Sequence, residues 1–153
     1  MNKVIGIVLR YKDKMLSDKS DTILEHNKIF DEYKKVFFGK VGKYIGANTV
    51  KICNDNKIEK YLLLVTNKHG YLFHAAKIES AQTERPPLHL IPEYYRNSKD
   101  IKSWICINSP LMKLDEVEIN NWVIKSTGMS IASSLSSSMA AYFLAVRKSP
   151  IAN

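Results

Sequence analysis

Cysteine is scarce in this chain of 153 residues, and the two present, Cys53 and Cys106, form no CxxC pair. Their separation argues against a zinc knuckle and against a disulfide framework, and it suits a reducing compartment. Long apolar runs are also missing near the start: the first apolar run covers only residues 4–9. Such a run is too short for a signal peptide or a membrane span. We therefore expect a cytoplasmic protein with no membrane partner.

Catalytic signatures are absent as well. The sequence contains no HExxH, no GxSxG, no GxxxxGK[ST] and no GxGxxG after a strand,. Cys106 lies between two isoleucines, which favours buried packing over an activated thiolate, and His74 lies in a predicted strand as a structural histidine,. Asp115, Glu116 and Glu118 lack a metal-binding partner motif and are expected to form a solvated face. We predict no catalytic residue, metal or cofactor, and hence no enzyme.

Acidic residues are too few to balance the basic ones. Lys and Arg number 23 against 15 Asp and Glu, which gives a net charge of +8 and a pI near 9.4. Such a surface favours polyanions, of which nucleic acids are the commonest in cells, although net charge also serves solubility alone. Only four of the basic residues are arginines. Lysine suits phosphate contact, whereas arginine reads bases in grooves, so backbone attraction is the better fit.

The order of apolar and polar segments predicts alternating secondary structure. Residues 4–11 read as a strand, and a helix capped by Asp21 or Ser20 follows, with apolar residues at three- and four-residue spacing,. Residues 59–80 predict a hairpin around Gly70, and 83–96, with three prolines, predict a loop,. Further expected segments are short strands at 35–39 and 101–107, weak pairing at 50–53, an ambiguous stretch at 111–125, an exposed helical turn or loop at 130–138 and a closing strand at 140–146.

This pattern predicts one α+β domain: a curled, mostly antiparallel β-sheet or barrel of about six strands with two or three helices. We assign residues 1–147 to the domain and 148–153 to the start of a linker or tail.

Aromatic residues with basic neighbours mark the candidate site. Tyr94 and Tyr95 lie in a polar, proline-bounded loop, and Phe37 is bracketed by lysines. Flat side chains stack an unpaired base at about 1–3 kcal/mol each, and cations hold its phosphates. The alternative is that strand aromatics belong to the core, above all Trp104. The candidate phosphate-binding residues are Lys34, Lys35, Lys40, Lys43, Arg96 and Lys99.

Taken in order, these segments resemble the YTH branch of the PUA-like superfamily, including its EVE-type relatives. The likeness rests on the hairpin from Tyr61-Leu62-Leu63 to Glu79-Ser80-Ala81 and on the strand IKSWICI with the turn after it. It covers roughly residues 4–127 and implies the PUA-like fold. It also implies a pocket for one modified base. The residues it assigns to that pocket are Phe37, Tyr94, Tyr95, Trp104, Asn108 and Ser109.

Two departures concern the pocket walls. Phe37 stands where the YTH proteins have a tryptophan, and the loop around Tyr94 and Tyr95 contains none.

The segments VFFGK and SMAAYFLAV also resemble the N-terminal specificity domain of McrB-like modification-dependent restriction GTPases. That resemblance implies a module that flips a modified, methylated base out of DNA, and a C-terminal AAA+ GTPase motor and nuclease subunit as partners. Two alternatives stay open: a PUA-like protein that binds methylated RNA or tRNA, and a small inhibitor or interaction protein of a defence system.

Overall fold

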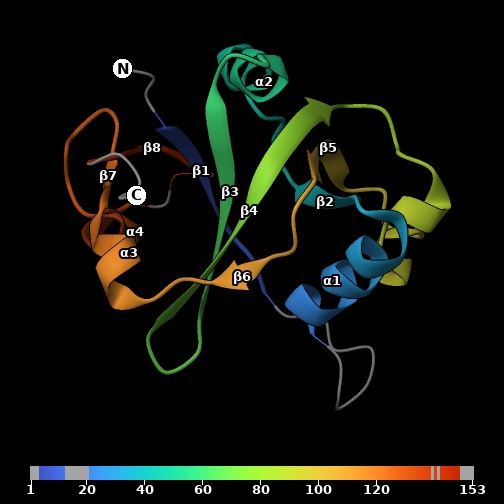
Figure 1. Cartoon of the computed structure of the whole chain (residues 1–153), viewed down its shortest axis with the longest axis horizontal. Helices are drawn as coiled ribbons and strands as arrows, with labels where there is room; N and C mark the ends of the chain where they lie inside the picture. Colours follow the sequence, from blue (N-terminus) through green and yellow to red (C-terminus); the bar gives the residue numbers. More distant parts are fainter. Residues whose placement is uncertain (1–3, 13–20, 139, 141, 149–153) are drawn as a thin grey trace.

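A computed structural model describes residues 4–12, 21–138, 140 and 142–148 (Figure 1). Within these residues it has an α+β architecture, as predicted, with two more strands and one more helix than expected. The strands are β1 (Val4–Arg10), β2 (Val36–Val41), β3 (Glu59–Asn67), β4 (Tyr71–Gln82), β5 (Ile101–Ile107), β6 (Met112–Lys113), β7 (Trp122–Ile124) and β8 (Phe143–Arg147). The helices are α1 (Thr22–Tyr33), α2 (Ala47–Asn54), α3 (Glu116–Asn120) and α4 (Ile131–Ser137), and the 3-10 turns are η1 (Leu88–Leu90) and η2 (Glu93–Tyr95).

The strands form one mostly antiparallel sheet in the order β2-β5-β4-β3-β1-β8-β7, with β6 paired to β4. The exception is β1, which runs parallel to β3. The long strand β4 curls the sheet: its first part pairs with β3, and its last part pairs with β5 after a register shift between Ile78 and Ser80. Such a shift bends a strand and increases its twist. The predicted curled, mostly antiparallel sheet is therefore confirmed.

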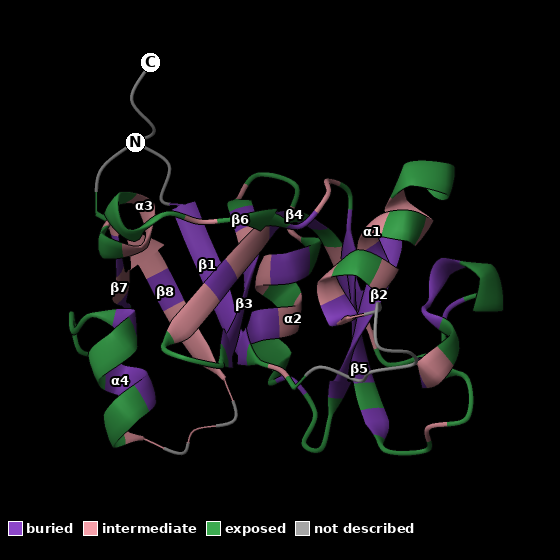
Figure 2. Ribbon diagram, turned by 90° about the horizontal axis from the view of Figure 1, so that it is seen from below, coloured by how far each residue is buried: buried purple, intermediate pink, exposed green. Residues whose placement is uncertain are grey.

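Side chains alternate across the central strands and feed cores on both faces. Figure 2 colours β1 almost entirely purple, which marks it as buried. Ile7 and Leu9 of β1 join the core under α1 and α2, whereas Val8 joins the core under α4. This period of two is the geometry of a strand buried on both faces. A third, smaller cluster covers the outer face of β2 and β5, where the loop 83–100 crosses it.

Two local predictions were wrong or incomplete. Residues 50–53 lie in helix α2 and not in a strand, because Thr49 and Cys53, four residues apart, both become buried on the helix face toward β4. The ambiguous stretch 111–125 divides into β6, α3 and β7. The serine-rich segment forms helix α4, capped by Ser130, whose hydroxyl accepts a hydrogen bond from the Ser133 amide.

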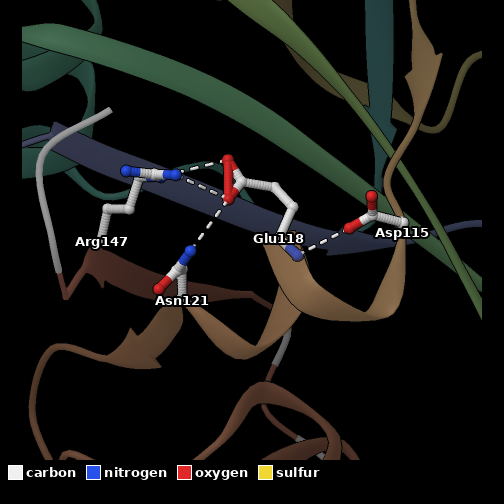
Figure 3. Close-up of polar contacts among 4 residues, drawn as sticks. All are labelled: Asp115, Glu118, Asn121 and Arg147. Carbon is white, nitrogen blue, oxygen red and sulfur yellow. Dashed lines mark hydrogen bonds and ion pairs between the residues drawn. The ribbon is translucent and has the colours of Figure 1, made fainter. Parts of the chain in front are cut away.

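The acidic cluster has a structural role that the sequence did not indicate (Figure 3). The carboxylate of Asp115 caps α3 by accepting from the Glu118 amide at 2.8 Å. Glu118, expected to be solvated, forms an ion pair with Arg147 at 2.8 Å and accepts a longer bond from Asn121 at 3.5 Å. These contacts tie α3 to the end of β8.

No helix among the described residues is long and apolar enough to cross a membrane. Residues 149–153 of the predicted tail lie outside the described residues.

Candidate functional site

A cavity of about 260 Å³ opens between the end of β1 and β2, the outermost strand at one edge of the described sheet. We call it the seam cavity. The first residue of α1 and the 3-10 turn η2 complete its wall. The lining residues are Leu9, Arg10, Tyr11, Lys12, Thr22, Phe38, Gly39, Lys40, Val41, Tyr94 and Tyr95.

Aromatic rings build one side of the seam cavity. Tyr95 is buried and packs edge-on against Trp104 at 5.5 Å between ring centroids and against Phe38 at 6.4 Å. Tyr94, only half-buried, lies 4.6 Å from Tyr95 between centroids. Burial raises the pKa of Tyr95 well above its ordinary value. Its hydroxyl interacts with the backbone of Gly39 and with the side chain of Tyr94.

The proline-bounded loop holds these tyrosines in place through Arg85. Pro92 begins the turn η2, and its carbonyl accepts from the Tyr95 amide at 3.0 Å. The guanidinium of Arg85 donates to the Tyr95 carbonyl at 3.0 Å and to the Ser98 carbonyl, and it lies 5.2 Å from the ring centroid of Trp104. Charge-assisted hydrogen bonds and a cation–π contact thus fix the loop on the outer face of β5.

A buried histidine supports the aromatic wall from α1. His26 is fully buried, and its ring lies 5.5 Å from both Phe38 and Tyr95 between centroids. Its Nδ1 donates to the carbonyl of Thr22 at 2.7 Å, whereas Nε2 has no hydrogen-bond partner among the described residues. Burial lowers the pKa of His26 to about 4. The ring is therefore neutral near pH 7, with an unused acceptor behind the tyrosines.

Basic side chains also line the seam cavity. Lys40 is only 6 % exposed, its ammonium donates to the Lys43 carbonyl at 2.7 Å, and burial lowers its pKa. Arg10 is committed to the fold, because its guanidinium donates to the carbonyls of Leu135, Ser138 and Ala140 at 2.8 to 2.9 Å. Lys12 is exposed beside them. The cavity therefore combines aromatic faces with positive charge.

A comparison with known families assigns the fold to a family. A family model described as Pua-like matches residues 7–134, most of the chain. The chain belongs to the Pua-like family. Comparisons with curated proteins and with solved structures give no significant match. Pua-like domains are in general modules that bind RNA or other nucleic acids, and they are typically non-catalytic. The match supports nucleic acid as the partner, while the YTH and restriction resemblances stay predictions.

In this Pua-like domain, three predicted site residues meet at the seam cavity: Tyr94, Tyr95 and Lys40. Phe37 does not line it, because its ring packs in the cluster on the other face of β2, and its neighbour Phe38 faces the cavity. Trp104 lies behind Tyr95 as a fully buried residue. The resemblance assigned the pocket wall to Phe37. Residues 36–40 are buried on both faces of the strand, so no alternation in the sequence marks which phenylalanine faces the cavity.

The predicted base-edge residues lie elsewhere, after the end of β5. The Asn108 amide donates to the Lys77 carbonyl at 3.0 Å, and the hydroxyl of Ser109 accepts from the Lys77 amide at 2.7 Å. Five predicted phosphate-binding residues are exposed and line no part of the seam cavity; they are Lys34, Lys35, Lys43, Arg96 and Lys99. Their surface positions are compatible with phosphate contacts outside the cavity.

Sequence reasoning missed the contribution of β1 and α1. Arg10 ends the apolar strand β1, and Tyr11 and Lys12 follow it directly. Polar residues at the end of a buried strand often reach a site, so the sequence contained this signal. Thr22 and His26, four residues apart, are both buried on α1. Cys106 is buried as expected, and burial raises the pKa of its thiol to about 12. No cluster of three metal-ligating side chains occurs within the part of the chain that the structure describes.

Proposed function

We propose that this Pua-like domain recognises one modified base in DNA by holding it, flipped out of the duplex, in the seam cavity. The observation that supports this most is a cavity of about 260 Å³ whose lining combines aromatic rings with basic side chains. Drug-sized ligands occupy about 300–1,000 Å³, so this cavity suits one small planar heterocycle. A base in contact with Phe38 and Tyr94 gains stacking energy without any bond chemistry.

The free-energy cost of extruding a base decides how much binding energy the cavity has to supply. Extruding a nucleotide costs a few kcal/mol, and stacking returns about 1–3 kcal/mol for each aromatic face. Burying an added methyl contributes only about 0.8 kcal/mol. Selectivity for a modified base therefore also needs polar groups that fit one base edge. The wall carries donors for this purpose, among them the exposed ammonium of Lys12 and the ammonium of Lys40, which also donates to the Lys43 carbonyl.

The positive surface supplies affinity without sequence preference. Exposed lysines near β2, together with Lys12 at the cavity, attract phosphates and release counterions on binding,. We propose that the domain serves as the specificity module of a modification-dependent restriction system, in which a GTPase motor and a nuclease subunit act on the DNA that it marks. Copurification of such a motor with the tagged natural protein tests this second step.

The experiment is a binding titration with labelled probes that differ at one base: unmodified, 5-methylcytosine, 5-hydroxymethylcytosine or N6-methyladenine, each as DNA duplex and as single-stranded RNA where that base exists. We expect one modified duplex to bind about tenfold more tightly than its unmodified counterpart, and Tyr94→Ala to remove that margin. Tyr61→Ala is the matched control, because Tyr61 is also half-buried but does not line the seam cavity.

The competing outcomes are distinct. A modified RNA that binds best, and loses affinity when its 2′-hydroxyls are removed, would move the proposal from DNA to RNA. Equal binding of all probes, abolished at high salt, would leave charge alone as the explanation and refute base recognition. Salt-insensitive binding to a protein partner would instead favour an interaction protein.

A further inference from the structure

A second cavity shares a wall with the seam cavity. It has a volume of about 520 Å³ and lies where the β3–β4 hairpin meets the end of β1 and helix α4. We call it the hairpin cavity. The two cavities share Arg10, Tyr11 and Lys12. The remaining residues of the hairpin cavity are Val65, Thr66, Asn67, Tyr71 and Leu135.

Tyr11 stands between the two cavities. It directly follows β1, and its amide donates to the Val65 carbonyl at 2.9 Å, so the backbone there is fixed to β3. Its side chain is half-buried. A half-buried aromatic residue that borders two cavities is suited to separate two neighbouring bases, since its ring offers a face for stacking.

The hairpin cavity has the chemistry of a base subsite. Val65 and Leu135 give it apolar surface, and Tyr71, half-buried, adds a second aromatic ring. The carbonyl of the Asn67 side chain accepts from the Gly70 amide at 3.3 Å, and its amide nitrogen has no hydrogen-bond partner within the described part of the chain. Apolar walls with a few polar groups that fix orientation are typical of ligand sites.

The walls of this cavity are held before any ligand binds. Arg10 binds the carbonyls of Leu135 and of Ser138, and the hydroxyl of Tyr71 hydrogen-bonds to that of Ser136 at 3.1 Å. Helix α4 is thereby tied to both β1 and β4. A site fixed in this way loses little conformational entropy on binding.

We propose that the hairpin cavity holds the nucleotide next to the inserted base, with Tyr11 between the two bases. This inference rests on the proposed function. Adjacent nucleotides are joined by one phosphate, and the wall that the two cavities share carries the positive charges of Arg10 and Lys12. The domain therefore reads a dinucleotide: the modified base in the seam cavity and its neighbour in the hairpin cavity.

The test compares three DNA duplexes with the preferred modified base: one intact, and two with an abasic site on its 5′ or 3′ side. We expect one abasic duplex to bind the natural protein about tenfold more weakly, because one stacked base contributes about 1–3 kcal/mol. Tyr71→Ala should bind the intact and abasic duplexes equally. Asn67→Ala, a milder change at the exposed end of β3, should reduce the difference without affecting folding.

The same titrations separate this inference from the function on which it rests. Tyr94→Ala should lose the preference for the modified base yet still respond to the abasic neighbour. If the natural protein prefers the modified base but ignores both abasic sites, or if Tyr71→Ala and Asn67→Ala keep the full abasic effect, the hairpin cavity is not a nucleotide subsite. If the natural protein shows no preference for any modified base, both proposals fall.

Discussion

Two tryptophans near opposite ends of the sheet are buried in the same way and lead to different surroundings. Each packs over a strand glycine: a Cβ added to Gly39 would lie 3.0 Å from the Trp104 ring, and one added to Gly6 would lie 2.8 Å from the Trp122 ring. Trp104 then supports Tyr95, which lines the seam cavity. Trp122 instead packs near Tyr61, which lines neither cavity.

The difference lies in what covers each tryptophan. A loop fixed by Arg85 crosses Trp104 and leaves a cavity at its edge. Near Trp122, the ion pair between Arg147 and Glu118 ties the adjoining helix α3 to β8 (Figure 3). Two equally buried tryptophans therefore have different roles. Substitutions near Trp104 and substitutions near Trp122 can test those roles separately.

The largest expected effect comes from removing either indole. Trp104→Ala and Trp122→Ala should each lower the free energy of unfolding by about 3–5 kcal/mol, as truncation of buried aromatic residues does. Only Trp104→Ala should also abolish the preference for the modified base, because Tyr95 loses its support. Urea unfolding followed by binding in the cold, where both variants are folded, measures the two effects. Equal loss of base preference in both variants would contradict the comparison.

The next largest effect is a pH dependence confined to the Trp104 side. The native pKa of His26 is about 4, below its ordinary value of 6.5. Between these values the unfolded chain binds more protons, so stability is full above pH 6.5 and falls as the pH is lowered toward 4, by on the order of 3 kcal/mol. His26→Phe should flatten this part of the stability profile, measured by urea unfolding. His69→Gln, at the exposed hairpin tip, is the control and should leave the slope unchanged.

A smaller effect follows from filling the space beneath each ring. Gly39→Ala and Gly6→Ala place a methyl within 3.0 Å of an indole, and overpacking of this kind costs about 1–3 kcal/mol,. Thermal unfolding should show similar losses for the two. Gly39→Ala should in addition weaken binding of the modified base several-fold, since Gly39 lines the seam cavity. A variant Gly6→Ala that weakened base binding as much would show that the two halves are coupled.

The sequence predicted the helices and strands better than the contacts between them. The hairpin, helix α1 and β5 each carry a strong local signal: a glycine turn with φ of 121° at Gly70, an Asp21 cap and a strand rich in β-branched and aromatic residues. Tyr94 and Tyr95 were predicted for the site because a polar, proline-bounded loop shows no core periodicity; both line the seam cavity, and Tyr95 also packs in the buried cluster with Trp104. The parallel pairing of β1 with β3 leaves no trace in local periodicity, because it depends on a contact between distant segments.

The other differences between sequence and structure have separate physical causes. A strand buried on both faces shows no alternation, so its phase cannot be read: the prediction named Phe37, whereas Phe38 lines the seam cavity. Helix α2 is short, and its buried face consists of only Thr49 and Cys53, too few residues for a helical period to stand out. Asn108 and Ser109 were placed by resemblance alone, and the end of β5 positions them away from the seam cavity.

The smallest expected effect concerns charge and separates the two ends of the molecule by salt dependence. On duplex DNA, each phosphate that a cation neutralises adds about 0.9 to the steepness of log affinity against log salt. Lys12→Gln, at the wall that the two cavities share, should therefore make the slope shallower by about that amount. Lys125→Gln removes the same charge at the Trp122 end and should leave the slope unchanged. If both variants made the slope equally shallow, the DNA would be attracted by net charge over the whole surface, and the cavity end would have no special role in holding it.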